Sequence, residues 1–134
     1  MAGLEGITNV LKDFTTDLGT IDLMIIVDLQ GGDSGSYYPK KDDELDKIAT
    51  SSAKKMGELE SIIKRKKPDF TIEENLFSTI DKAILILRIS KDYVLCIVGS
   101  VDDFPGGYAK KMFKNGYKDD LKNAMRAAKL LGEE

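Results

Sequence analysis

The sequence predicts an α/β fold in which one five-stranded antiparallel sheet lies between two layers of helices. Three strand-like segments are apolar at both odd and even positions, which is typical of strands buried on both faces. Two weaker segments suit the edges of a sheet. Because the central strands need cover on both faces, helices must lie on both sides of the sheet, in a three-layer α/β/α arrangement.

Two helices are predicted in the first half of the chain. Residues 4–18 carry apolar side chains every three or four positions, as in a helix with one buried face, and Gly19 ends this pattern. The second helix is expected over residues 42–67. Acidic residues at its start complement the positive end of the helix dipole, and the basic run at residues 64–67 complements the negative end.

A glycine-rich stretch follows the first predicted strand, residues 21–29. Phosphate-binding loops also place glycines after a strand, but they lead directly into a helix whose N-terminal amides hold the anion. Here residues 31–35 lead into the β-prone pair Tyr37-Tyr38, and no Gly-Lys-Ser/Thr follows. We therefore interpret residues 31–35 as a hairpin loop that uses glycine's access to positive φ, with Tyr37-Tyr38 as the second strand.

Three consecutive strands are predicted in the second half of the chain. Residues 76–81 alternate apolar and polar side chains, which suits an edge strand, whereas residues 83–89 and 93–98 are apolar at both parities and belong inside the sheet. The short turns between these segments allow only antiparallel hairpins. With the two-faced strands in the centre, the spatial order that satisfies all the hairpins is 2-1-5-4-3.

The chain is expected to finish as a helix. Asp102 or Asp103 is the predicted cap, and Pro105 lies in the first turn. Asn115-Gly116 interrupts the apolar pattern, although the pattern nearly keeps its phase across this point. One kinked helix and two short helices are both consistent with the sequence.

Length and composition restrict the function. A chain of 134 residues is the usual size of one domain, and we expect a single domain over residues 1–134. The absence of histidine and the single cysteine exclude imidazole catalysis and an internal disulfide framework. Cys96 lies in a predicted central strand and is expected to be a buried core residue instead of a nucleophile. No catalytic residue, metal site or cofactor is therefore expected.

Charge and hydropathy indicate a soluble cytoplasmic protein. The N-terminus lacks the signal-peptide pattern, and no apolar run approaches the roughly 20 residues that span a bilayer. The net charge of -3 argues against general affinity for nucleic acid. For the basic run at residues 64–67 we favour a helix C-terminus complemented by its own cations over a nucleic-acid or lipid contact.

Basic side chains also recur every four residues in the last predicted helix. On a continuous α-helix each four-residue step overshoots a full turn by roughly 40°, so the row would spiral slowly around the helix. We interpret it as a solvated helix face in preference to an attachment site for an acidic partner or a membrane surface. The row consists of Lys110, Lys114, Lys118, Lys122 and Arg126.

With this order of elements the chain resembles the Roadblock family of small dimeric proteins related to dynein light chains. The resemblance covers nearly the whole length. It rests on the opening helix with its glycine-rich loop, the second helix, the apolar pair AILILRIS and YVLCIVGS, and the acidic, Pro-Gly entry DDFPGGYAKK into the last helix. Longin and profilin-like modules share the α/β/α arrangement and stay open as protein-binding or ligand-sensing alternatives. A profilin-type site needs an exposed aromatic cluster, whereas this chain has no tryptophan.

The Roadblock resemblance implies a non-catalytic protein that forms homodimers, or heterodimers with a paralogue, and binds a small Ras-like GTPase as a scaffold or regulator. It also implies that the second helices of two subunits lie side by side and that the third strands join the two sheets. The candidate partner-binding residues are Lys54, Lys64 and Arg65 on the second helix. We expect binding to position the GTPase's own residues and not to insert a catalytic arginine.

Two rows of residues on the second helix predict what packs against it. A stripe of mostly larger side chains is expected to face the chain's own sheet. A row of small residues, Ala49, Ala53 and Gly57, is expected to let the partner's helix approach, in preference to lying flat on the sheet margin. Glycine inside a helix costs roughly 1 kcal/mol relative to alanine, so Gly57 calls for a packing reason. The sheet-facing stripe consists of Leu45, Ile48, Ser52, Met56, Leu59 and Ile63. The predicted dimer interface consists of Ala49, Ala53, Met56, Gly57, Glu60, Phe77 and Thr79.

Overall fold

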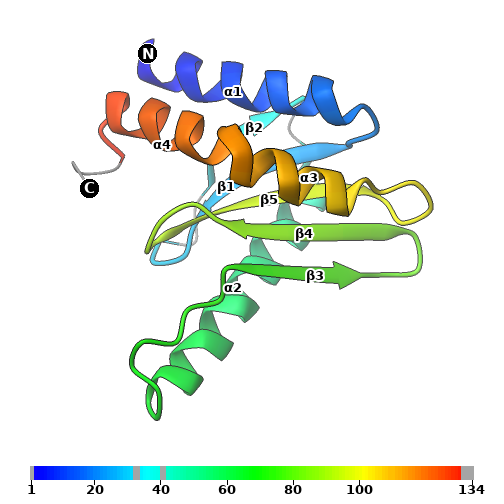
Figure 1. Ribbon diagram of the computed structural model, residues 1–134. Helices are drawn as coiled ribbons and strands as arrows, with labels where there is room; N and C mark the ends of the chain where they lie inside the picture. Colours follow the sequence, from blue (N-terminus) through cyan, green and yellow to red (C-terminus); the bar gives the residue numbers. More distant parts are fainter. Residues whose placement is uncertain (1, 32–33, 40–41, 131–134) are drawn as a thin grey trace.

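The computed structural model describes residues 2–31, 34–39 and 42–130. Its elements are α1 (Ala2–Leu18), β1 (Leu23–Asp28), β2 (Ser34–Tyr38), α2 (Asp43–Lys64), β3 (Glu74–Ser78), β4 (Lys82–Arg88), β5 (Tyr93–Ser100), α3 (Gly106–Met112), the π-helical segment η1 (Phe113–Tyr117) and α4 (Lys118–Ala127). Figure 1 shows the sheet in the middle, with α1, α3 and α4 on one side of it and α2 on the other. The predicted three-layer arrangement is confirmed.

The strands form one five-stranded antiparallel sheet of order β2-β1-β5-β4-β3, which is the predicted order. The central strand β5 pairs with β1 along Leu23–Asp28 and with β4 along Lys82–Arg88. Each outer strand pairs with one neighbour in the sheet, β2 with β1 and β3 with β4. Within the described residues, both outer strands therefore keep one edge without a partner strand.

Hydrophobic residues on the two faces of the sheet form two cores. One core joins alternate residues of β1, β4 and β5, such as Leu85, to Phe14 of α1 and to residues of α3, η1 and α4. The other core joins the intervening strand residues to α2 through Ala49, Ala53 and Met56. Burial of both strand faces explains why these three strands are apolar at both parities.

The glycine after the first helix and the acidic cap of the second helix lie where the sequence predicts them. Gly19 follows α1 with a φ of 89°, a conformation that residues with a Cβ rarely adopt. Asp42 caps α2, because its side chain accepts hydrogen bonds from the backbone N–H groups of Glu44 and Leu45 at 3.0 and 3.1 Å. The predicted end of the second helix at residue 67 is wrong, because α2 ends at Lys64 and residues 65–67 lie just beyond it.

The predicted position of the third strand is wrong by a few residues, because β3 covers Glu74–Ser78 and Thr79 lies in the following turn. The backbone N–H of Thr79 donates to the carbonyl of Lys82 at 2.7 Å, and its hydroxyl accepts from the N–H of Lys82 at 2.8 Å. Apolar and polar residues keep alternating into this turn, so periodicity alone placed the strand too late.

The predicted cap of the last helical region is also wrong. Asp102 and Asp103 lie in a turn, and the residue at the N-cap position of α3 is Pro105, which makes no side-chain capping hydrogen bond. The turn is fixed by packing: a Cβ at Gly99 would lie 3.0 Å from Cδ1 of Phe104 and 3.2 Å from the Thr20 carbonyl oxygen. A side chain at position 99 would force the Phe104 ring or the Thr20 carbonyl to shift by a few tenths of an ångström.

The last helical region is continuous, and a π-helical segment takes up the interruption at Asn115-Gly116. This segment places Phe113 in the core and stacks Tyr117 on Phe14 with ring centroids 4.4 Å apart. The hydroxyl of Tyr117 donates to the carboxylate of Asp17 on α1. The π-helical turn contains one more residue than an α-helical turn, and the helix continues through it without a break.

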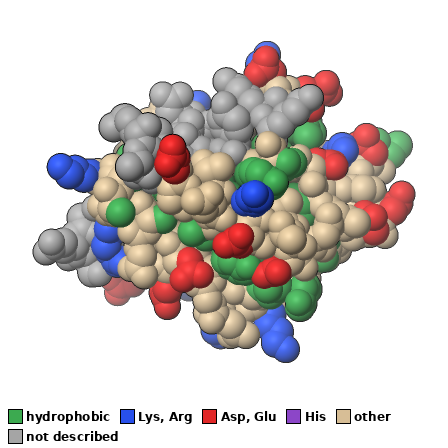
Figure 2. Space-filling view, turned by 90° about the horizontal axis from the view of Figure 1, so that it is seen from above, with side chains coloured by type: hydrophobic (Ala, Val, Ile, Leu, Met, Phe, Trp, Pro, Cys, Tyr) green, Lys and Arg blue, Asp and Glu red, His purple; other side chains and the backbone are tan. Residues whose placement is uncertain are grey.

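The surface on the α1 side of the molecule is mixed in character. Seen from above in the orientation of Figure 1, hydrophobic side chains gather in a limited area that acidic and basic side chains border (Figure 2). Among the residues that the structure describes, no helix has both the length and the hydropathy that crossing a membrane requires.

Candidate functional site

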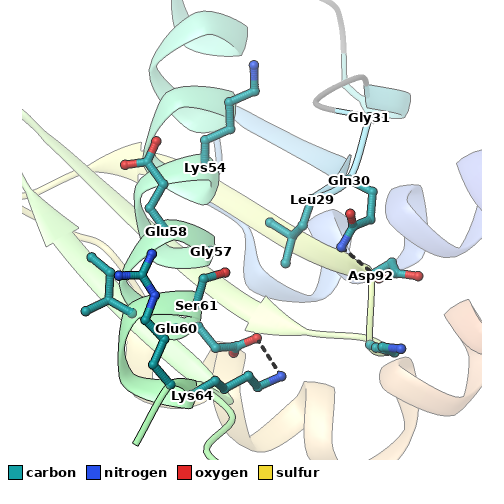
Figure 3. A pocket seen from close by; sticks show the side chains of 13 residues that line it. Leu29, Gln30, Gly31, Lys54, Gly57, Glu58, Glu60, Ser61, Lys64 and Asp92 are labelled. Atoms are coloured by element: carbon teal, nitrogen blue, oxygen red, sulfur yellow. Dashed lines mark hydrogen bonds and ion pairs between the residues drawn. The ribbon is translucent and has the colours of Figure 1, made fainter. Parts of the chain in front are cut away.

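A cavity of about 680 Å³ opens beside the C-terminal half of α2 (Figure 3). Its other wall is made by the turn after β1, at residues 29–31, and by the turn between β4 and β5, at residues 91–92. We call it the α2 cavity. It is lined by Leu29, Gln30, Gly31, Lys54, Gly57, Glu58, Glu60, Ser61, Ile62, Lys64, Arg65, Lys91 and Asp92.

Hydrogen bonds join the two turns that form this wall. The backbone N–H of Leu29 donates to the carbonyl of Asp92 at 2.8 Å, and Nε2 of Gln30 donates to Oδ1 of Asp92 at 3.4 Å. The carboxylate of Asp28 accepts from the N–H of Gln30 at 2.9 Å. The wall is therefore held as one piece at the end of the β1–β5 pair.

A buried ion pair anchors α2 beneath the cavity. Glu60 and Arg88 are 7% and 5% exposed, and their side chains pair directly. Oε2 of Glu60, the oxygen that pairs with Arg88, also accepts from the N–H of Ile72 at 2.8 Å. Oε1 of Glu60 lies 3.4 Å from Nζ of Lys64. Arg88 also donates to the carbonyls of Ile72 at 3.1 Å and Lys91 at 2.8 Å. These bonds join α2 to the segment before β3 and to the β4–β5 turn.

The three residues predicted to bind a partner, Lys54, Lys64 and Arg65, all line the α2 cavity. Lys91 from the opposite wall adds a further cation that the sequence reasoning missed. Among the described residues, Lys54, Arg65 and Lys91 form no ion pair with a carboxylate. The cavity thus presents cations that an acidic surface can pair with.

The turn residues of this wall could have been placed from the sequence. β1 and β5 are neighbours in the predicted order, and in the structure Asp28 at the end of β1 stands opposite Tyr93 at the start of β5. The turn after β1 and the turn before β5 must therefore lie at the same end of the sheet. Gln30, Lys91 and Asp92 follow from that topology once α2 is known to cross the same face.

The predicted role of the small-residue row is wrong. Ala49 and Ala53 have no exposed surface, because they pack on the chain's own sheet, and Met56 is only 1% exposed. Glu60 is held in its ion pair, and Phe77 packs against the same core. Thr79 lies in a turn and not in the edge strand. The alternative, that small residues let α2 lie close to its own sheet, is the one observed.

The inward face of α2 is therefore rotated from the predicted one. Leu59, which was expected to face the sheet, is 48% exposed, and its neighbour Ile62 is 56% exposed. Residues two apart on a helix point about 160° away from each other, so Leu59 lies nearly opposite Gly57. Gly57 faces Leu29 in the turn after β1, which forms one wall of the α2 cavity. Leu59 is therefore on the side of α2 that points away from this wall.

Gly57 is not required by close packing. A Cβ at this position would meet Cδ2 of Leu29 at 3.8 Å, which is an ordinary contact distance. Gly57 lies between Lys54 and Ser61 in the lining of the cavity (Figure 3).

The α2 cavity carries groups for binding and lacks the parts of a phosphate cradle. Gly31 reaches it, but the helix that it faces presents its C-terminal half, whose dipole disfavours an anion. In the described part of the chain no cluster of three or more histidine, cysteine, aspartate or glutamate side chains could hold a metal. Cys96 is fully buried elsewhere, and burial raises the pKa of its thiol, so it is an inert core residue as predicted.

No protein-family model and no curated protein sequence matches the chain, whereas solved structures do. An MglB with a tetrameric arrangement superposes with a TM-score of 0.74 at 17% identity, over 95% of this chain and 93% of the other. MglB from Myxococcus xanthus gives 0.71 at 13% identity, over 90% and 95%. A Roadblock/LC7 domain from Streptomyces avermitilis gives 0.68 at 8% identity, over 92% and 98%. Likeness at these identities establishes the fold.

Proposed function

We propose, from the premise that this chain has the Roadblock fold, that it is a single-domain, non-catalytic cytoplasmic protein that dimerises and binds a small Ras-like GTPase at the α2 cavity. The observation that carries the proposal is the convergence of Lys54, Lys64 and Arg65 on one solvent-open cavity. The family resemblance supports the class of partner, and the cations around the α2 cavity support the choice of surface.

The cavity suits a protein partner better than a small metabolite. Its cations stand at the rim on α2 and on the β4–β5 turn, and Leu29 and Ile62 add apolar surface between them. Charged rims around an apolar centre are usual in protein interfaces, where the charges raise the association rate and select the partner. Anchoring by Glu60 and Arg88 keeps this surface in place before binding, which lowers the entropy lost on association.

The exposed side of α2 supports the proposed self-association. Leu59 lies on an exposed flank of α2, and β3 is an outer strand whose free edge can pair with a strand of another chain. Exposed edges favour pairing with another chain, and a two-fold pairing covers both copies at once. The tetrameric arrangement of one MglB structure is in keeping with self-association of this fold. We propose a dimer that uses the Leu59 side of α2 and the edge of β3, which leaves the α2 cavity open.

Charge reversal at the rim tests the proposed docking site. The double variant Lys54→Glu/Arg65→Glu is expected to weaken binding of a Ras-like GTPase from the same organism by at least tenfold, about 1.4 kcal/mol, because both side chains would repel an acidic partner surface. Isothermal titration with the GTPase in its GDP and GTP-analogue forms measures this directly.

The matched control reverses two lysines on the opposite helical layer, Lys12→Glu/Lys122→Glu, and should bind as the wild type does. Arg65→Ala, with binding kept, should leave any stimulation of GTP hydrolysis in place, because the proposed effect is positioning. Equal affinity for the wild type and the Lys54→Glu/Arg65→Glu variant would refute docking at the cavity. Loss of stimulation in Arg65→Ala would instead identify Arg65 as an inserted catalytic arginine.

A further inference from the structure

A second cavity lies on the other face of the sheet, between the start of β3, the end of β4 and the helical segments α3, η1 and α4. Its volume is about 560 Å³. It is lined by Glu73, Glu74, Leu87, Arg88, Lys110, Lys111, Phe113, Lys114 and Lys118, and we call it the lysine cavity. It shares no residue with the α2 cavity.

The π-helical segment explains why lysines of the four-residue row meet in one place. In an α-helix each step of four residues overshoots the turn by roughly 40° and carries the row away from any single line. A π turn contains more residues than an α turn, so a four-residue step through it falls short instead. Lys110, Lys114 and Lys118 lie before, within and after η1. The overshoot of the α-helical step and the shortfall of the π-helical step therefore oppose each other, and the three lysines stay on one side of the helix. All three line the lysine cavity, contrary to the predicted spiral.

Most of these cations are not neutralised. Nζ of Lys110 lies 3.1 Å from Oε2 of Glu74, and both side chains are about half exposed. Arg88 is committed to Glu60 on the other face of the sheet. Lys111, Lys114 and Lys118 form no ion pair with any carboxylate in the described residues, and the remaining acid in the lining is Glu73. The cavity therefore has a surplus of positive charge.

The shape of the cavity favours an extended acidic peptide over a membrane surface. Its lining includes the apolar side chains of Leu87 and Phe113, which are 3% and 5% exposed at the base of the lysine row. A flat bilayer cannot enter a concave site, and Glu73 and Glu74 on the opposite rim would face its anionic headgroups. A peptide can place acidic side chains on the lysines and an apolar side chain toward the base.

We propose that the lysine cavity is a docking site for an acidic protein segment that carries an apolar anchor residue. This site goes beyond the proposed GTPase contact and is independent of it, because the two cavities lie on opposite faces of the sheet. Charge complementarity to Lys111, Lys114 and Lys118 selects the acidic partner. A chain with two such surfaces can hold a GTPase and an acidic segment at the same time.

The test uses a fluorescein-labelled peptide of alternating glutamate and leucine as the probe, with fluorescence anisotropy as the readout. The wild type should bind it, and the triple variant Lys111→Glu/Lys114→Glu/Lys118→Glu should bind at least about tenfold more weakly. The same peptide with glutamine in place of glutamate should bind as weakly as the variant does. Lys110 is left unchanged so that its ion pair with Glu74 is kept.

A variant of equal charge serves as the control, Lys12→Glu/Lys47→Glu/Lys66→Glu, whose lysines lie outside the lysine cavity, and it should bind the peptide as the wild type does. The proposal is overturned if the wild type does not bind, if the two triple variants bind alike, or if the glutamine peptide binds as well as the glutamate peptide. Sedimentation with phosphatidylserine vesicles that depends on the same lysines, without peptide binding, would assign the surface to a membrane and also overturn it. GTPase titration of the Lys111→Glu/Lys114→Glu/Lys118→Glu variant should be unchanged, which separates this test from that of the proposed function.

Discussion

Replacing Glu60 by alanine is expected to lower the free energy of unfolding by about 3–5 kcal/mol, because it leaves the buried guanidinium of Arg88 without its carboxylate. The loss also removes the acceptor for the N–H of Ile72, which Glu60 binds at 2.8 Å. Urea denaturation followed by circular dichroism measures the change.

Two further variants separate the ion pair from ordinary surface effects. Glu58→Ala removes an exposed carboxylate from the same helix, one that lies 3.6 Å from Lys55, and should change stability by no more than about 0.5 kcal/mol. Glu60→Leu combined with Arg88→Met should recover much of the loss, because no charge is then left buried alone. If Glu60→Ala costs no more than Glu58→Ala, the ion pair does not anchor α2.

Placing arginine at Leu59 is expected to convert the proposed dimer to a monomer. Leu59 is 48% exposed on the side of α2 away from the cavity, where the proposed two-fold contact brings two α2 helices together. A large cation there should raise the dimer dissociation constant by roughly 30-fold or more, about 2 kcal/mol, as for a residue at the centre of an interface. Sedimentation equilibrium across a range of concentrations measures it.

Val101→Arg is the matched control, since Val101 is also an exposed aliphatic residue but lies in the turn after β5. It should leave the dimer intact. A wild type that is monomeric at micromolar concentration, or a Leu59→Arg variant that stays dimeric, would contradict the proposed contact. Arginine at Ala53 would be a poor test, because that position is buried against the chain's own sheet and the variant would unfold.

The sheet could be predicted from the sequence because its rules are local. Apolar residues at both parities identified β1, β4 and β5 as two-faced strands, and short turns restricted their neighbours. Hairpins then left one order that keeps the weaker strands at the edges. The bounds were less accurate where turn chemistry decided them, as at Thr79, whose hydroxyl accepts from the N–H of Lys82 and closes the β3–β4 turn.

The inward face of α2 could not be predicted from hydrophobic periodicity. Leu59 is more apolar than Glu60, yet Glu60 faces the sheet because Arg88 on β4 supplies its partner. A pairing between residues so far apart in the chain leaves no local pattern. Ala49 and Ala53 are small enough to lie where α2 comes closest to the sheet. A row of small residues lets a helix approach another helix or a sheet equally well, so the sequence alone did not identify the neighbour.

Some of the residues that line the α2 cavity could be named from the sequence, and others could not. Lys54, Lys64 and Arg65 were chosen as cations on the second helix, and the α2 cavity brings them together because they share the flank that faces the turn after β1. Lys91 was missed because it lies in the turn between β4 and β5, far from the second helix in the sequence. The π-helical segment was equally hidden, since Asn115-Gly116 signals an interruption but not its kind.

Hydrogen–deuterium exchange of the chain with and without a saturating Ras-like GTPase from the same organism tests the central proposal most directly. Binding at the α2 cavity should slow exchange in three segments that are distant in sequence, residues 54–65, 29–31 and 91–92, which together form its walls. Exchange in α3 and α4 should be unchanged, because those helices cover the opposite face of the sheet. A complex that protects those helices and leaves the three cavity segments unprotected, or no change with any such GTPase, would contradict the proposal.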